Sequence, residues 1–158
     1  MVLVALVGFT LDRITKALAL AHLSAGVPTT SLLGGWVSLE LIFNSGAAFS
    51  MGSSATIVFS LLALAALCVM FVWVWPRARG WLASVCAGMI VAGISGNLAD
   101  RMLRPPGVFR GHVVDFIAVR YFAVFNVADI FITCAAVLFV IHVLRSGRHD
   151  DSRPEGSR

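Results

Sequence analysis

Two aspartates lie in an apolar stretch toward the C-terminal part of the chain, which reads VVDFIAVRYFAVFNVADIFI over residues 113–132. They are Asp115 and Asp129, and Asn126 precedes the second by three residues. Two carboxylates held close together in a low-dielectric site do not both ionise, so one keeps a proton and the other loses it. The ionised carboxylate can take a proton from water while the protonated one donates to an amide carbonyl. This is the division of labour in aspartic-protease hydrolysis.

Further polar and small residues interrupt the apolar segments and are candidates for supporting that pair. They are Asp12, Lys16, Asn44, Gly46, Asn97, Arg101 and Asn126. Asp12 and Lys16 are four residues apart, as are Asn97 and Arg101, so each pair shares one face of a helix. If the helices pack as a bundle, these groups converge at one end of it together with Asp115 and Asp129.

The same residues also allow purely structural interpretations. Asp129 could form a buried ion pair with Arg101 or Arg120, and spacing alone does not separate this from catalysis. Asp12 and Lys16, taken alone, favour an intrahelical pair. The NSG sequence at residues 44–46 is also common turn chemistry.

Several charges near these motifs have less certain roles. Asp100 stands next to Arg101 and is interpreted as a charge at a helix end rather than a catalyst. Arg104, Arg110 and Arg120 add positive charge to the segment 101–124. They could contact lipid phosphates or belong to a solvated loop.

No metal or cofactor is expected from the sequence. The four histidines show no HExxH or other ligand spacing, and the three cysteines form no CxxC pair. Each cysteine lies inside an apolar run and is interpreted as a buried small hydrophobe.

The composition indicates that the solvent for most of this chain is lipid. Hydrophobic residues make up 59% of the 158 residues, charged residues 13%, and the mean hydropathy is +0.91. Soluble domains carry about 25% charged residues. The net charge of +4 does not indicate nucleic acid, since no basic stripe interleaves with aromatic residues.

Four segments are predicted to span the membrane, each near the roughly 20 residues that a helix needs. They are residues 2–22, 55–75, 81–97 and 125–144. The first is interrupted by charges but fits a membrane helix better than a signal peptide, because no basic residue precedes its apolar run. Residues 36–43 alternate enough to predict a short strand, and 101–124 are loop-like and then β-prone. The fold class is therefore an all-α membrane protein with four transmembrane helices and a small extracytoplasmic β-rich segment and loop.

The motifs resemble those of lipoprotein signal peptidase, the signal peptidase II family of bacterial membrane aspartic peptidases. LDRITK resembles the D-x-x-[ST]-K block of this family, and FNSGAAFS its N-x-G-x-[AS]-F block. GISGNLADR resembles G-x-x-G-N-x-x-D-R, while HVVDFI and FNVADIFI resemble the two blocks that each hold a catalytic aspartate. The ordered set covers about residues 11–144. One departure is Arg13, which replaces the usual glutamine.

The resemblance implies an enzyme that removes the signal peptide from diacylglyceryl-modified prolipoproteins, cutting before the lipidated cysteine. It implies Asp115 and Asp129 as the catalytic dyad, with Asn126 orienting Asp129 or the water. It also implies a multi-pass protein of the bacterial inner membrane, with cytoplasmic termini and an active site toward the outer leaflet. Globomycin-type cyclic peptides are expected to bind over the dyad, and a monomer is sufficient.

One membrane domain is expected over residues 1–145, followed by a disordered polar cytoplasmic tail at 146–158. Two other classes of protein fit the sequence less well. A proton-coupled transporter would place its carboxylates near the membrane midplane, whereas here they gather at helix ends. A membrane scaffold does not account for the polar motifs.

Overall fold

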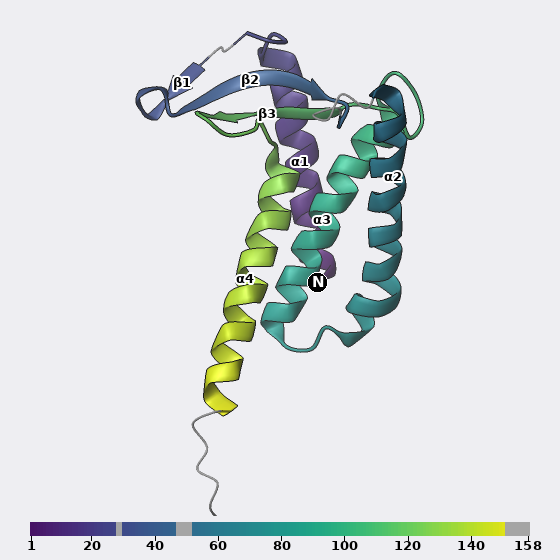
Figure 1. Ribbon diagram of the computed structural model, residues 1–158, viewed down its shortest axis with the longest axis vertical. Coiled ribbons are helices and arrows are strands. Elements are labelled where there is room, and N and C mark those ends of the chain that lie inside the picture. Colours follow the sequence, from purple (N-terminus) through teal and green to yellow (C-terminus); the bar gives the residue numbers. More distant parts are fainter. Residues whose placement is uncertain (28–29, 47–51, 151–158) are drawn as a thin grey trace, which may run out of the picture.

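The computed structural model describes residues 1–27, 30–46 and 52–150. Its long helices are α1 (Val2–His22), α2 (Gly52–Val69), α3 (Trp81–Leu103) and α4 (Val127–Asp150). Helix α2 continues into a π-helical turn, η2 (Met70–Val74), and a 3₁₀ turn, η3 (Trp75–Arg77). Figure 1 shows the helices running side by side, with a small sheet lying across one end of the bundle.

Three helices in the described part of the chain are long and apolar enough to cross a membrane. They cover Ala55–Arg77, Trp81–Leu103 and Val127–Arg145, at the positions of three predicted spans. Helix α1 is not among them, because three charged residues lie within it: Asp12, Arg13 and Lys16. The chain is thus mostly helical with three candidate spans and a small sheet.

Helix α3 is the centre of the bundle, since it contacts α1, α2 and α4. Its small residues allow this close approach, as in other membrane helices. A Cβ at Gly93 would clash with the backbone oxygen of Ala128 in α4, and a Cβ at Gly96 would clash with the carboxylate of Asp12 in α1. Larger residues at these two positions would separate the helices at the end that faces the sheet.

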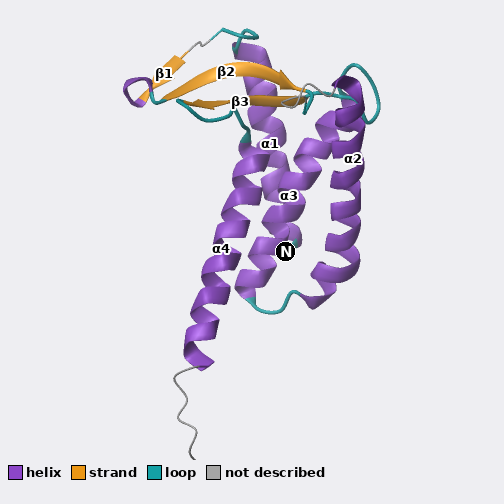
Figure 2. Cartoon of the chain, viewed as in Figure 1, coloured by secondary structure: helices purple, strands orange, loops and turns teal. Residues whose placement is uncertain are grey.

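The sheet has three antiparallel strands in the order β1 (Thr30–Leu32), β2 (Val37–Asn44) and β3 (Val113–Val119). Strand β2 confirms the strand predicted at 36–43, and β3 lies in the segment predicted to be β-prone. Val114 and Phe116 of β3 pack with Leu41 of β2 against Ala19 of α1. This apolar contact fixes the sheet across the end of the helices (Figure 2).

Two features differ from the sequence analysis or fall outside the structure. Cys86 is buried as predicted, but Cys68 and Cys134 are exposed on the outer faces of their helices. The interpretation as buried residues is wrong for these two, because apolar side chains of a membrane helix can face lipid. Helix α4 continues to Asp150, past the predicted domain boundary at 145, and residues 151–158 of the predicted tail lie outside the described residues.

Candidate active site

Asp115 lies in β3 on the sheet face that is directed toward the start of α4. Its side chain is only 3% exposed. Asn44 donates from Nδ2 to Oδ2 of Asp115 at 2.8 Å, and Asn126 donates from Nδ2 to Oδ1 at 2.6 Å. Burial raises the pKa of Asp115 to about 6, against the lowering effect of the two amide donors and with a further increase from the charge of Asp129. A proton is therefore easily held on this carboxyl group.

Asp129 lies in the first turn of α4 and is half-buried. Asn126 precedes the helix, and the two residues cap it reciprocally. The backbone N–H of Asn126 donates to Oδ2 of Asp129 at 3.1 Å, and the backbone N–H of Asp129 donates to Oδ1 of Asn126 at 3.2 Å. Asn97 of α3 donates from Nδ2 to Oδ1 of Asp129 at 2.8 Å. The helix start thus holds this carboxylate in one orientation.

Asn126 brings the two carboxylates together. Its side chain donates to Asp115 and also to Oδ1 of Asn97, at 3.0 Å, while its backbone donates to Asp129. The guanidinium of Arg101 interacts electrostatically with both aspartates, and its buried Nε has no hydrogen-bond partner among the described residues. Two acidic groups, a shared amide and a nearby cation therefore meet at the sheet end of the bundle.

A second polar cluster, formed by ion pairs, lies beside the first. Lys16 is fully buried between Asp12 of α1 and Asp100 of α3, with N–O distances of 3.0 and 2.9 Å. Asp100 also binds Arg13 and Arg104, each at 2.6 Å. Lys16 and Asp100 are fully buried, so removing either one leaves buried charges without their counter-charge, which is strongly destabilising.

The ion-pair cluster is connected to the candidate dyad and to the elements around it. Lys16 donates from Nζ to Oδ1 of Asn97 at 3.0 Å. The backbone N–H of Ala128 donates to Asp12 at 3.0 Å, and that of Val114 donates to Asp100 at 3.3 Å. These bonds hold the start of α4 and strand β3 against α1 and α3.

Asp100 is the residue that sequence reasoning missed. It was interpreted as a charge at a helix end, yet its side chain is fully buried and contacts three cationic groups. Two signals were available in the sequence: Asp100 is the aspartate of the G-x-x-G-N-x-x-D-R block, and Arg104 follows it by four residues on the same helical face. The contacts with Arg13 and Lys16 depend on the packing of α1 against α3 and have no local signal.

The structure brings together all nine predicted site residues, and the alternative interpretations can be compared with their contacts. The Asp12–Lys16 pair exists, but it also joins two other helices. Asn44 makes a turn, accepting from the backbone N–H of Gly46 at 2.7 Å, and it binds Asp115 at the same time. Asp129 forms no ion pair with Arg101 or Arg120 in the described part of the chain. Residues 47–50 of the FNSGAAFS motif lie outside the described residues.

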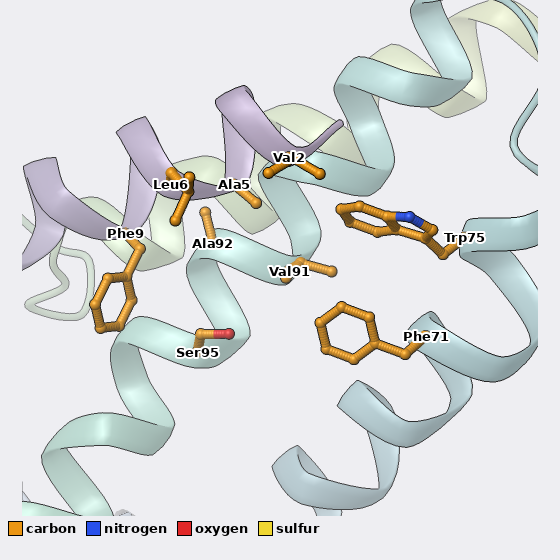
Figure 3. A pocket seen from close by; sticks show the side chains of 9 residues that line it. All are labelled: Val2, Ala5, Leu6, Phe9, Phe71, Trp75, Val91, Ala92 and Ser95. Atoms are coloured by element: carbon orange, nitrogen blue, oxygen red, sulfur yellow. The ribbon is translucent and has the colours of Figure 1, made fainter.

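Two cavities differ in their relation to these carboxylates. One, of about 420 Å³, is lined by Asp129 and by Phe122, Phe125, Ile130, Thr133 and Cys134. The other, of about 380 Å³, lies between α1, α3 and the end of α2, and Figure 3 shows its side chains. Its lining is apolar apart from Ser95, so it offers no acid or base. Only the first of these two cavities combines apolar walls with a candidate catalytic group.

Comparison with known proteins identifies the family. The family model described as signal peptidase (SPase) II matches residues 4–145. The chain belongs to the signal peptidase II family. The resemblance drawn from the motifs is thereby confirmed.

Signal peptidase II relatives cover most of this chain. Proteins named lipoprotein signal peptidase are 40% identical over 143 residues in Leifsonia xyli and 41% identical over 138 residues in Streptomyces coelicolor. The protein of that name in Mycobacterium tuberculosis is 44% identical over 138 residues. These matches cover 90%, 87% and 87% of the chain. The chain spans 65–67% of the length of these relatives.

Solved structures of two bacterial membrane enzymes have a similar fold. A bacterial membrane enzyme determined at 1.9 Å resolution superposes with a TM-score of 0.78 at 25% identity, over 90% of each chain. A second bacterial membrane enzyme, at 2.3 Å resolution, superposes with a TM-score of 0.79 at 23% identity, over 99% of this chain and 93% of the other. The second likeness supports the fold alone.

Proposed function

We propose that this signal peptidase II family member hydrolyses the peptide bond before the diacylglyceryl-modified cysteine of a prolipoprotein, with Asp115 and Asp129 as the catalytic dyad. The observation that supports the proposal is that Asn126 donates hydrogen bonds to both carboxylates, from its backbone to Asp129 and from its side chain to Asp115. The members of such a dyad have different protonation states and divide the roles of acid and base. Among the described residues, no other pair of carboxylates accepts hydrogen bonds from amide groups without also forming an ion pair.

The roles within the dyad follow from the surroundings of each carboxylate. Asp115 is more deeply buried, so it holds the shared proton and donates it to the carbonyl oxygen of the scissile amide. Asp129 is half-buried and lines the cavity, so it takes a proton from the attacking water. The tetrahedral intermediate then passes a proton to the amide nitrogen, and the C–N bond breaks to give a carboxylic acid and an amine.

The supporting residues orient these groups rather than react. Asn44, Asn97 and Asn126 donate to the carboxylates, and Gly46 holds the amide of Asn44 in place. Arg101 lies near both aspartates with an unsatisfied N–H, which suits it to bind the substrate backbone or to stabilise charge that develops on it.

The proposed topology has four spans, with α1 as the additional one. Its charged side chains are tied to α3 and α4, so they do not need to face lipid. The sheet and dyad would face the outer leaflet of the bacterial inner membrane. The termini and the turn with Arg77 and Arg79 would be cytoplasmic. The positive-inside rule favours this orientation only weakly, because Arg101, Arg104, Arg110 and Arg120 lie toward the opposite side. A monomer suffices, since the residues of the proposed site come from one chain.

A cleavage assay tests this function directly. The full chain is incubated with a diacylglyceryl-modified precursor or with its unlipidated form, and the release of the signal peptide is followed by gel shift. We expect cleavage of the lipidated form only, and its inhibition by globomycin. Equal cleavage of both forms, or no cleavage of either by folded protein, would reject the proposed activity.

A further inference from the structure

The end of the sheet farthest from α2 carries a cluster of large exposed side chains around one arginine. We call Leu33, Trp36, Arg120, Tyr121 and Phe122 the aromatic tip. The backbone N–H of Arg120 donates to the oxygen of Trp36 at 2.9 Å, so the end of β3 is tied to the β1–β2 hairpin. Leu33, Trp36, Tyr121 and Phe122 are 79%, 58%, 85% and 71% exposed. The cluster therefore has a fixed scaffold and an open surface.

Arg120 is a cation held by aromatic rings. Its guanidinium carbon lies 4.9 Å from the ring centre of Tyr121 and 5.9 Å from that of Trp36. Such contacts are attractive and orient the guanidinium. Within the described residues no carboxylate forms an ion pair with it. Its charge is thus available to an external anion, and a guanidinium suits the oxygens of a phosphate.

The backbone holds two of these side chains in unusual positions. Leu33 and Tyr121 have φ angles of 49° and 65°, in the left-handed region that large residues rarely adopt. Such conformations persist only where the surrounding structure imposes them, and they cluster at functional sites. Here they occur in two turns at the same end of the sheet. Both turns expose apolar side chains that a water-facing surface would not favour.

The position of the aromatic tip relates it to the membrane and to the dyad. Figure 1 shows the β1–β2 hairpin extending sideways beyond the start of α4. The candidate span Val127–Arg145 begins a few residues after Phe122, so the tip lies next to the end of a segment able to cross the membrane. Phe122 packs edge-on against Phe125, and both line the cavity that contains Asp129.

We infer that the aromatic tip binds the headgroup phosphate of an anionic phospholipid. Arg120 supplies the charge, and Trp36 and Tyr121 lie in the headgroup layer, where such amphipathic rings are favoured. The bound lipid fixes the end of the sheet against the leaflet beside the opening to Asp129. The inference concerns lipid binding, goes beyond the proposed function and does not depend on the peptidase chemistry.

Tryptophan quenching in bilayers tests the inference without using activity. The full chain, with Trp73, Trp75 and Trp81 replaced by Phe so that Trp36 is the only tryptophan, is reconstituted in phosphatidylcholine. The bilayers contain the same mole fraction of brominated phosphatidylglycerol or brominated phosphatidylcholine. We expect about five-fold enrichment of the anionic lipid at Trp36, the factor that one basic residue contributes near an anionic surface. Arg120→Gln should abolish it, and Arg120→Lys should retain most of it.

A matched control separates the specific site from general attraction of lipid to a basic face. Arg110 is also exposed and lies before β3, but it forms no cation–π pair with an aromatic ring in the described structure. Arg110→Gln should leave the enrichment at Trp36 unchanged. The inference is overturned if the unaltered tip is quenched equally by both lipids, if Arg120→Gln retains the preference, or if Arg110→Gln removes it as completely.

Discussion

Four aspartates meet at the sheet end of the bundle, and they fall into two groups with different partners. Asp12 and Asp100 contact cations, while Asp115 and Asp129 accept hydrogen bonds from asparagine amides and backbone N–H groups. Neutral donors stabilise the ionised form of a carboxylate less than cationic partners do. The difference suits the first group to hold the helices together and the second group to the proposed exchange of a proton.

Asn97 and Lys16 connect the two groups. The side-chain amide of Asn97 accepts a hydrogen bond from Lys16 and donates one to Asp129. Asn97 therefore links the ion-pair cluster to the proposed dyad. If this comparison is right, damage to the ion pairs should appear mainly as lost stability. Substitutions of Asp115 or Asp129 should mainly lower the rate of cleavage.

The largest expected effect comes from the dyad itself. Asp115→Asn and Asp129→Asn should each reduce cleavage of the lipidated precursor by at least about 10³-fold, because each removes one member of the acid–base pair. Both proteins should still insert and melt cooperatively. Turnover near that of the unchanged protein in either variant would show that the amide-bound aspartates are not the dyad.

The next largest effect is expected in the ion-pair cluster. Asp100→Asn should lower the free energy of unfolding by about 3–5 kcal/mol, because Lys16, Arg13 and Arg104 lose their shared counter-charge. Arg13→Gln is the matched control. Its side chain is 30% exposed, and the expected loss is at most about 1 kcal/mol. Thermal unfolding in detergent gives both values, and equal melting of Asp100→Asn and the unchanged protein would remove the structural role assigned to Asp100.

A dependence of stability on pH is expected from Asp115. Its pKa is raised from 3.8 to about 6, so the protonated form is favoured in the folded protein. That contribution is complete below about pH 4 and is lost as the pH rises through 6, which amounts to roughly 3 kcal/mol. Unfolding measured from pH 4 to 7.5 should show this decline, and Asp115→Asn should lack it. An identical pH dependence in both proteins would argue against a buried, proton-holding Asp115.

A smaller effect is expected at the bridging amide. Asn126→Ala should lower kcat by about 10-fold to 100-fold, because the side-chain hydrogen bonds to Asp115, to Asn97 and from the backbone N–H of Asp129 are lost. Ser60 provides a control, because it is a fully buried polar residue of α2 that binds the backbone of Phe109. Ser60→Ala should leave kcat unchanged. Steady-state kinetics that show equal losses in the two variants would remove the special role of Asn126.

The sequence allowed the prediction of residues that carry local signals. The apolar runs predicted three helices that qualify as spans, and the motif residues predicted where the polar cluster would form. Strand β1 was not predicted, because three residues are too few to show alternation. The contact of Asp100 with Arg13 could not be predicted, because it joins residues 87 positions apart. Such contacts depend on how α1 packs on α3, and the spacing of residues along the chain does not predict that packing.

The most direct test asks whether Asp115 and Asp129 are close enough to share one proton. Infrared spectra recorded through a pH titration report the band of protonated carboxyl groups. We expect a component that disappears near pH 6, is missing in Asp115→Asn, and shifts to lower pH in Asp129→Asn because the neighbouring charge is gone. A component at Asp115 whose titration is unaffected by Asp129→Asn would contradict a shared proton and, with it, the proposed dyad.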